Sequence, residues 1–138
     1  MRTIKGNRSR GRKTRLDGIT FASQGEANRY CELRLLERSG QISHLELQPV
    51  FPLIVNGQPL RLRSDGYPNG RRAKYVADFR YVEAGKVVVE DYKAVDTDLS
   101  RLKRAILEAQ GIDIRIVTPA RTSARARTPR RTGTRIRP

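Results

Sequence analysis

The amino-acid sequence predicts an α/β domain of the α+β kind, in which a mixed central sheet is flanked by helices. Two segments carry apolar residues at helical spacing, which indicates amphipathic helices. Between them lie short segments rich in valine and tyrosine, which favour strands. The second helical segment is followed at once by an apolar stretch, and a right-handed crossover would bring that stretch back parallel to an earlier strand.

The charge of the chain is divided between two tails and a nearly neutral middle. The 138 residues carry a net charge of +15, from 29 basic and 14 acidic residues. Seven basic residues lie in 1–15 and seven in 121–138, and neither range contains an acid, so 15 basic and 14 acidic residues remain in 16–120. We therefore expect one folded domain over 16–120, between a disordered basic N-terminal segment (1–15) and a disordered arginine-rich tail (121–138).

Two flexible basic segments suit a polyanion, because each neutralised phosphate releases condensed counterions. Nucleic acid is therefore the expected partner, and a solubilising role of the tails is the alternative. A membrane is not expected, because the tails lack the apolar residues of an amphipathic face. The tail residues predicted to contact DNA are Arg125, Arg127, Arg130 and Arg131.

The cysteine and histidine content excludes several classes of site. The single cysteine, Cys31, leaves no disulfide framework and no CxxC metal site. The single histidine, His44, excludes a histidine-rich zinc site within one chain. No segment is apolar enough for a membrane span or a signal-peptide core, so we expect a cytoplasmic protein.

The first helix is expected to run from its N-cap at Ser23 to about Arg38. Ser23 and Glu26 have the spacing of a capping box, in which each residue bonds the backbone N–H of the other. Asp17-Gly18 indicates a turn before the helix, and Gly40 is placed to end it. The residues expected on its buried face are Ala27, Tyr30, Cys31, Leu33 and Leu35.

Four strands and one loop are expected in the middle of the chain. Asn56-Gly57 indicates a tight hairpin turn, and Ala84-Gly85 a second short turn. Three turn-forming residues predict a loop over Ser64–Arg72. The expected strands are Phe51–Val55, Leu60–Arg63, Ala73–Val82 and Lys86–Lys93.

The second helix is expected from Leu99 to about Ala109, capped by Asp96-Thr97-Asp98 and ended by Gly111. A last strand, Ile112–Val117, would then lie parallel to the strand that ends at Lys93. The expected buried face of this helix consists of Leu99, Leu102, Ile106 and Ala109.

Two acids lie opposite each other in the hairpin formed by the last two strands before this helix. A two-residue turn at Ala84-Gly85 fixes the register, which places Asp78 directly opposite Asp91. Opposed residues have Cβ atoms roughly 4.5–5.5 Å apart, and like charges there are destabilising. Two carboxylates this close require a cation or the protonation of one of them. The hairpin therefore predicts a site for a hard divalent ion such as Mg²⁺, with Mn²⁺ as a substitute.

Strand alternation adds Lys93 to the pair. Asp91 and Lys93 are two residues apart, so both side chains point to the face that also carries Val87 and Val89. A bound metal ion would polarise a phosphate and activate a water, and the Lys93 ammonium would orient that water or offset developing charge. Asp78, Asp91 and Lys93 are therefore the predicted catalytic residues. The alternative is an exposed salt-bridge patch without catalytic function.

Glu26 has two interpretations. Helical angles place it on the core-facing side of the first helix, where it could be a third metal ligand. The capping box explains the same residue without a metal. The residues alone favour the cap.

These residues resemble the PD-(D/E)XK nuclease superfamily, with Ala77-Asp78 as the first motif element and Asp91-Tyr92-Lys93 as the second. The surrounding sequence resembles a family of small phage-encoded endonucleases of this superfamily, over roughly residues 16–118. The layout is similar to that of the phage endonuclease I Holliday-junction resolvases. The matching segments are Asp17–Ser23, Glu26-Ala27, Arg29-Tyr30, Leu45–Pro49, Tyr75–Tyr81, Val88–Lys93 and Lys103-Arg104.

The resemblance implies a restriction-endonuclease-like core and a nuclease domain over 16–120. It implies that Glu26 is a further metal ligand and catalytic residue, beside the two aspartates. The sequence departs from the resemblance at Ala94, where related sequences tend to have glycine, and at Gly25, which weakens the start of the helix. The DNA contacts implied within the domain are Arg29, Gln48, Lys103 and Arg104.

Three functions are open at this point. The first is a Mg²⁺-dependent DNA endonuclease, selective for branched DNA such as Holliday junctions, in phage replication, recombination or packaging. A homodimer and the cytoplasm of a bacterial host belong to this prediction. The second is a non-catalytic DNA-binding protein on a nuclease-like fold, and the third an RNA-binding accessory protein. The intact pair of aspartates with Lys93 favours the first.

Overall fold

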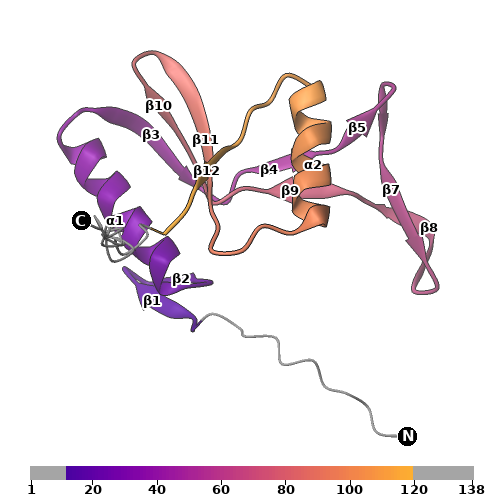
Figure 1. The fold of residues 1–138 in the computed structure, drawn as a ribbon, viewed down its shortest axis with the longest axis horizontal. Helices are drawn as coiled ribbons and strands as arrows, with labels where there is room; N and C mark the ends of the chain where they lie inside the picture. Colours follow the sequence, from indigo (N-terminus) through magenta and orange to yellow (C-terminus); the bar gives the residue numbers. More distant parts are fainter. Residues whose placement is uncertain (1–11, 120–138) are drawn as a thin grey trace, which may run out of the picture.

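The structure is a computed structural model, and it describes residues 12–119 (Figure 1). The predictions for residues 1–11 and for the arginine-rich tail lie outside the described residues; they include Arg125, Arg127, Arg130 and Arg131. The helices are α1 (Gln24–Arg38) and α2 (Asp98–Ala109). The strands are β1 (Thr14–Leu16), β2 (Ile19–Phe21), β3 (Ile42–Leu47), β4 (Val50–Pro52), β5 (Ile54–Val55), β6 (Gln58–Pro59), β7 (Arg61–Ser64), β8 (Tyr67–Arg72), β9 (Lys74–Val76), β10 (Phe79–Glu83), β11 (Lys86–Tyr92) and β12 (Arg115–Val117).

Four strands form the central sheet, in the order β12-β11-β10-β3. β10 pairs antiparallel with both β3 and β11, whereas β12 lies parallel to β11, so the sheet is mixed. The parallel return of β12 after α2 is the crossover that the sequence predicts. A mixed sheet with two helices confirms the predicted α+β class.

Two hydrophobic clusters pack on the two faces of the β10–β11 hairpin. Phe79 lies in the cluster formed with α1, whereas Val89 lies in a cluster with Leu107 of α2. Side chains alternate along a strand, so neighbouring residues of β11 face opposite clusters. Glu90 and Asp91 are therefore both buried, but on opposite faces of the sheet. This arrangement gives the molecule two separate buried acids next to each other in sequence.

A short hairpin of β1 and β2 precedes α1. Its turn, Asp17-Gly18, has φ angles of 51° and 75°, which suit a two-residue hairpin turn. The disordered N-terminal segment predicted for 1–15 is therefore too long, because Thr14-Arg15 belongs to β1. Backbone pairing forms this strand although its side chains are mostly polar.

β3 is a strand that the sequence analysis does not predict. Its alternation breaks at His44, which has a φ of 55°, and its pairing with β10 shifts register between Arg80 and Val82. A bulge of this kind inserts an extra residue and interrupts the period of two on which strand prediction relies. His44 therefore lies in a strand.

Residues 50–76 form an extended segment beside α2, which we call the arm (Figure 1). In the arm β4 pairs with β9, β5 with β6, and β7 with β8. Asn56-Gly57 forms the predicted hairpin turn, with φ angles of 52° and 72°. The loop predicted over Ser64–Arg72 is wrong, because pairing with β7 makes most of it strand β8. The single strand predicted over Ala73–Val82 is divided at Ala77-Asp78 into β9 and β10.

Both helices lie close to their predicted bounds, but their buried faces differ from the predictions. In α1, Cys31 and Leu35 are exposed. In α2, Leu99 and Leu102 are 63% and 60% exposed, and Leu107 is the buried residue. The second helix is therefore turned so that two leucines near its N-terminal end face away from the core.

Candidate active site

Asp78 and Asp91 face each other across the β10–β11 hairpin. The predicted register is confirmed as far as the pair of Phe79 and Glu90. One residue further, the Asp78 N–H donates to Asp91 Oδ1 at 2.8 Å, and the Tyr92 N–H donates to Asp78 Oδ2 at 2.7 Å. Each carboxylate is therefore held by a backbone donor of the opposite strand, and the two lie side by side.

Asp78 lies where the chain passes from the arm into the central sheet. The Gln48 N–H donates to the Asp78 carbonyl at 2.9 Å, and the Ala77 N–H donates to the Pro49 carbonyl at 3.0 Å. Gln48 has a φ of 53°, in the left-handed region that turns the chain here. Gln48, a predicted DNA contact, thus lies beside the site through its backbone, and its side chain is exposed.

Two further side chains engage Asp91, which is 2% exposed. The Tyr75 hydroxyl donates to Asp91 Oδ2, and the Lys93 Nζ lies 3.4 Å from the same oxygen. The Lys93 N–H donates to the Val117 carbonyl at 2.9 Å, so the parallel strand fixes this residue. Tyr75 is not among the predicted site residues. Its only signal in the sequence is its place in the segment Tyr75–Tyr81 that carries the nuclease resemblance.

A cleft of about 570 Å³ brings the predicted catalytic residues together. Glu26 lines it from the first turn of α1 and is 7% exposed. The Ser23 hydroxyl accepts the Glu26 N–H at 3.1 Å, which confirms the predicted N-cap. The reciprocal bond from the Ser23 N–H to the Glu26 carboxylate is not formed, so the carboxylate faces the cleft. The four residues are Glu26, Asp78, Asp91 and Lys93.

Burial and mutual repulsion raise the pKa values of two acids of this cleft, Asp78 and Glu26. Burial, and next the neighbouring charge of Asp91, raises the pKa of Asp78 to about 7, against the lowering effect of the Tyr92 N–H and of Lys93. Burial also raises the pKa of Glu26, again with a contribution from Asp91. Of the residues that line the cleft, three are acids and one is a base. The cleft therefore has fewer basic than acidic side chains.

The donor set of the cleft fits a hard divalent cation. Among residues 12–119, no three Asp, Glu, His or Cys side chains converge closely enough to form a metal cluster. Two carboxylates do converge, those of Asp78 and Asp91. Because Mg²⁺ binds through one or two carboxylates together with water and substrate phosphate, this pair is sufficient. Glu26 lines the same cleft but does not form a three-carboxylate cluster with this pair.

Arg104 is largely buried and is paired with an acid. Its Nη1 donates to Asp96 Oδ1 at 2.9 Å, and its side chain is 15% exposed. The pKa of Asp96 is lowered by this pair, and Arg104 Nη1 also donates to the Ser100 hydroxyl at 2.9 Å. The pairing argues against the predicted DNA contact. Arg104 instead links α2 to Asp96 in the segment that precedes the helix.

Arg29 belongs to a different cluster. Its guanidinium donates to both oxygens of Glu90, at 2.7 Å and 3.0 Å, and the Tyr81 hydroxyl donates to the same carboxylate at 2.7 Å. Glu90 is fully buried, on the face of β11 opposite to Asp91. Arg29 also bonds Glu32 at 2.8 Å. These pairs argue against the prediction that Arg29 contacts DNA.

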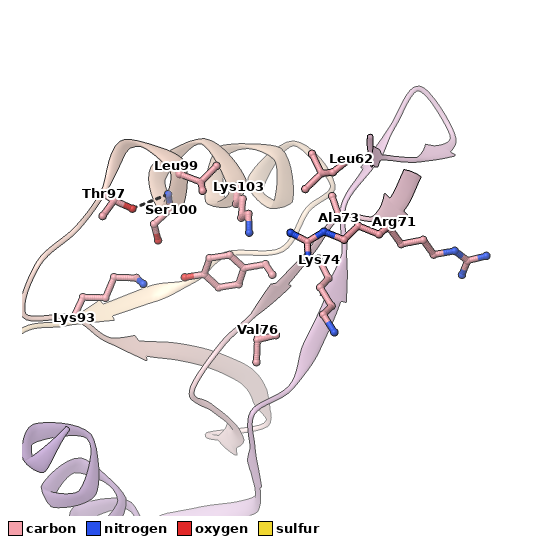
Figure 2. Close-up of a pocket in the computed structure, with 12 residues that line it drawn as sticks. Leu62, Arg71, Ala73, Lys74, Val76, Lys93, Thr97, Leu99, Ser100 and Lys103 are labelled. Carbon is pink, nitrogen blue, oxygen red and sulfur yellow. Dashed lines mark hydrogen bonds between the residues drawn. The ribbon is translucent and has the colours of Figure 1, made fainter. Parts of the chain in front are cut away.

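Lys103, the remaining DNA contact predicted within the domain, has a different environment. It is half-buried on α2, and among residues 12–119 it forms no ion pair with an acid. Figure 2 shows its ammonium group pointing from α2 toward the space beside Lys93. Lys103 therefore keeps a charge that a ligand could neutralise.

Gly25 allows α1 to approach the site. A Cβ at this position would overlap the ring of Tyr92. Only glycine leaves room for this contact between the first turn of the helix and the end of β11. From the sequence alone, Gly25 is expected to weaken the start of the helix. In the structure its lack of a side chain lets α1 pack against Tyr92, which brings Glu26 to the cleft.

Comparisons with known proteins give a family and no activity. Residues 7–125 match the family described as "Protein of unknown function (DUF1064)". A search of curated proteins and a search of solved structures found no match. No helix of the described part of the chain has the length and apolarity needed to cross a membrane. What the protein does must therefore be inferred from its own residues.

Proposed function

This chain belongs to the DUF1064 family, and we propose that it is a metal-dependent endodeoxyribonuclease that hydrolyses phosphodiester bonds. The proposal includes DNA as the partner and Mg²⁺ as the cofactor, with Mn²⁺ as a substitute. It also includes a preference for branched DNA, which the nuclease resemblance implies.

One observation carries the proposal: the reciprocal backbone bonds that hold Asp78 and Asp91 together in a cleft. Like charges at this spacing are destabilising, and burial adds a desolvation cost. Such arrangements are concentrated at functional sites. An acid pair beside a lysine is the set of groups that metal-assisted phosphodiester hydrolysis needs.

Asp78 and Asp91 would hold the ion, with Glu26 as a third donor. Asp78 Oδ2 accepts the Tyr92 N–H, and its other oxygen accepts no hydrogen bond from residues 12–119. That oxygen is available as a ligand. When bound, a divalent ion supplies Lewis-acid polarisation of a phosphate and lowers the pKa of a bound water.

The other residues of the site would act on charge, protons and position. Lys93 has its ammonium 3.4 Å from Asp91 Oδ2, and from there it can offset negative charge that develops on a phosphate oxygen. Glu26 lines the cleft and has a pKa that burial raises, so its carboxylate is suited to accept a proton from water. Tyr75 orients Asp91 through its hydroxyl. Every one of these groups belongs to the same chain, so the predicted homodimer is not required for the chemistry.

The alternative function is a DNA-binding protein without catalysis. It would use the same basic residues and would leave the acid cluster without a role. Because that cluster is the costly feature of the fold, we favour the nuclease. The proposed setting, a bacterial cytoplasm during phage DNA metabolism, rests on the resemblance alone.

The test is cleavage of supercoiled plasmid, a four-way junction and a linear duplex, with Mg²⁺ and with EDTA. We expect cleavage in Mg²⁺ only, and its loss in Lys93→Ala. Lys86→Ala is the matched control, because Lys86 is an exposed lysine at the other end of the same strand. Absence of cleavage by the wild type on all three substrates, in Mg²⁺ and Mn²⁺, would contradict the proposal.

A further inference from the structure

A second hollow lies beside the cleft, between α2 and the arm (Figure 2). Its volume is about 690 Å³, and we call it the basic groove. Lys93 and Val76 line both the basic groove and the cleft of the acid pair, so the two hollows lie next to each other. A ligand in the groove would therefore lead directly to the proposed catalytic residues.

The basic groove is lined by five basic residues and by no acid. Besides Lys93 these are Arg71, Arg72, Lys74 and Lys103, and among residues 12–119 none of the four forms an ion pair. Figure 2 shows the Lys93 and Lys103 ammonium groups pointing into the space between α2 and the arm. Unpaired cations in a hollow concentrate positive potential, which attracts a polyanion.

Apolar side chains are exposed among these cations. Leu62, Val76 and Leu99 line the groove and are 49%, 45% and 63% exposed. Tyr67, on the same strand as Arg71, is 54% exposed, and the Arg71 guanidinium lies 5.6 Å from the centroid of its ring. The groove thus offers apolar contacts for bases as well as cations for phosphates, and Tyr67 with Arg71 adds a surface next to the groove on which a base can stack.

This mixture distinguishes between two forms of DNA. A duplex presents its phosphates and keeps its bases stacked inside, so it would leave the apolar side chains without partners. An unpaired strand exposes both its phosphates and its bases. We infer that the basic groove binds a single-stranded segment of DNA that continues into the cleft. The substrate class is then DNA with an unpaired flank. The link to cleavage rests on the proposed function, whereas strand binding by the groove does not.

The binding test uses the full chain in EDTA, with a labelled single-stranded oligonucleotide and a blunt duplex as probes in fluorescence anisotropy. The double variant Lys74→Ala/Lys103→Ala should bind the single strand about tenfold more weakly. Its slope of log affinity against log salt should be shallower by about 1.4, at about 0.7 for each phosphate contact on a single strand. An unchanged slope would overturn the inference.

A second variant tests the apolar part of the groove. Leu62→Ser/Leu99→Ser should weaken single-strand binding about fivefold, leave the salt slope unchanged, and leave duplex binding unchanged. The matched control for Lys74→Ala/Lys103→Ala is Arg38→Ala/Lys86→Ala, which removes two exposed cations outside the groove. The control should keep wild-type affinity for the single strand. An equal loss in the control would overturn the inference.

Cleavage in Mg²⁺ separates the inference from the proposed function. The wild type should cut a duplex with a single-stranded flank faster than a blunt duplex, and Lys74→Ala/Lys103→Ala should remove this preference. Cleavage of both substrates by this variant at wild-type rates would contradict strand binding by the basic groove. It would not contradict the proposed nuclease function. Groove-dependent binding without any cleavage by the wild type would refute the nuclease and support the groove.

Discussion

The two buried acids of β11, Glu90 and Asp91, are neighbours in sequence and have opposite surroundings. Both accept a hydrogen bond from a tyrosine hydroxyl, that of Tyr81 for Glu90 and that of Tyr75 for Asp91. Arg29 then neutralises Glu90 through two hydrogen bonds. Asp91 instead lies in a cleft that two other acids line and that has one lysine.

The different surroundings of Glu90 and Asp91 indicate a structural role for the first and a functional role for the second. An acid held by a bidentate arginine has its charge satisfied, so the Glu90 cluster can serve the fold alone. The pair of Asp78 and Asp91 has no such compensation, and the pKa of Asp78 is raised as a result. We infer that the missing positive charge is supplied from outside the chain by a divalent cation.

The largest effect is expected for Asp78→Asn. Several kcal/mol of transition-state stabilisation would be lost, so plasmid cleavage in Mg²⁺ should fall about a thousandfold. Stability should not fall with it. The folded-state pKa of about 7 lies above the ordinary 3.8, so ionisation of Asp78 costs stability as pH rises between these values. At pH 8 the variant avoids that cost, and its thermal unfolding temperature should equal or exceed that of the wild type. A lower temperature would show that Asp78 is structural.

Glu90→Gln should lower stability and leave cleavage nearly unchanged, the reverse of Asp78→Asn. Removing one partner of a buried ion pair leaves Arg29 with only the exposed Glu32 as an acidic partner, and we expect a loss of about 3 kcal/mol in the free energy of unfolding by urea denaturation. The cleavage rate of the folded protein should change little. The control is Glu46→Gln, in the exposed pair with Arg80, which should cost less than about 1 kcal/mol. If the two losses were equal, the Glu90 pair would have no special role in the fold.

Glu26→Gln tests the third acid. Its carboxylate forms no return bond to the helix cap, so the substitution should leave stability near that of the wild type. The cleavage rate should fall about a hundredfold, as for loss of a group that supports a metal site. Single-turnover kinetics at saturating Mg²⁺ would measure the effect. A wild-type rate would limit Glu26 to its place in the helix.

Gly25→Ala is expected to have the smallest effect. The new methyl group meets the Tyr92 ring, and overpacking of this kind costs about 1–3 kcal/mol. Either the Tyr92 ring or the first turn of α1 must shift, and because both line the wall of the cleft with Glu26, cleavage should fall as well. The control Ala22→Gly removes a methyl group from an exposed position on the same cleft, and it should affect neither property by a comparable amount. Wild-type values for Gly25→Ala would show that the contact is relaxed at no cost.

The site was more predictable from the sequence than the arm was. The turn at Ala84-Gly85 sets the register of its hairpin, and register alone places Asp78 beside Asp91. Glu26 could be placed on the buried side of its helix from helical angles, because the helix is regular. Local geometry of this kind depends on few residues, so a single sequence contains it.

Features that depend on distant contacts could not be predicted. β3 was missed because the bulge at His44 breaks its alternation. The exposure of Leu99 depends on how α2 turns against the arm, and β8 forms by backbone pairing that leaves no hydrophobic pattern. The roles of Arg29 and Arg104 depend on Glu90 and Asp96, acids that no local pattern connects to them.

The most direct test of the account is the number of protons that Mg²⁺ displaces from the protein. Calorimetric titrations in buffers of different ionisation enthalpy measure this number. Because the pKa of Asp78 is raised to about 7, binding at pH 6 should release about one proton, and binding at pH 8 should release almost none. Asp78→Asn should lose the pH 6 release, and Glu90→Gln should keep it. Mg²⁺ binding without proton release at pH 6, or no binding at either pH, would contradict a metal site at Asp78 and Asp91.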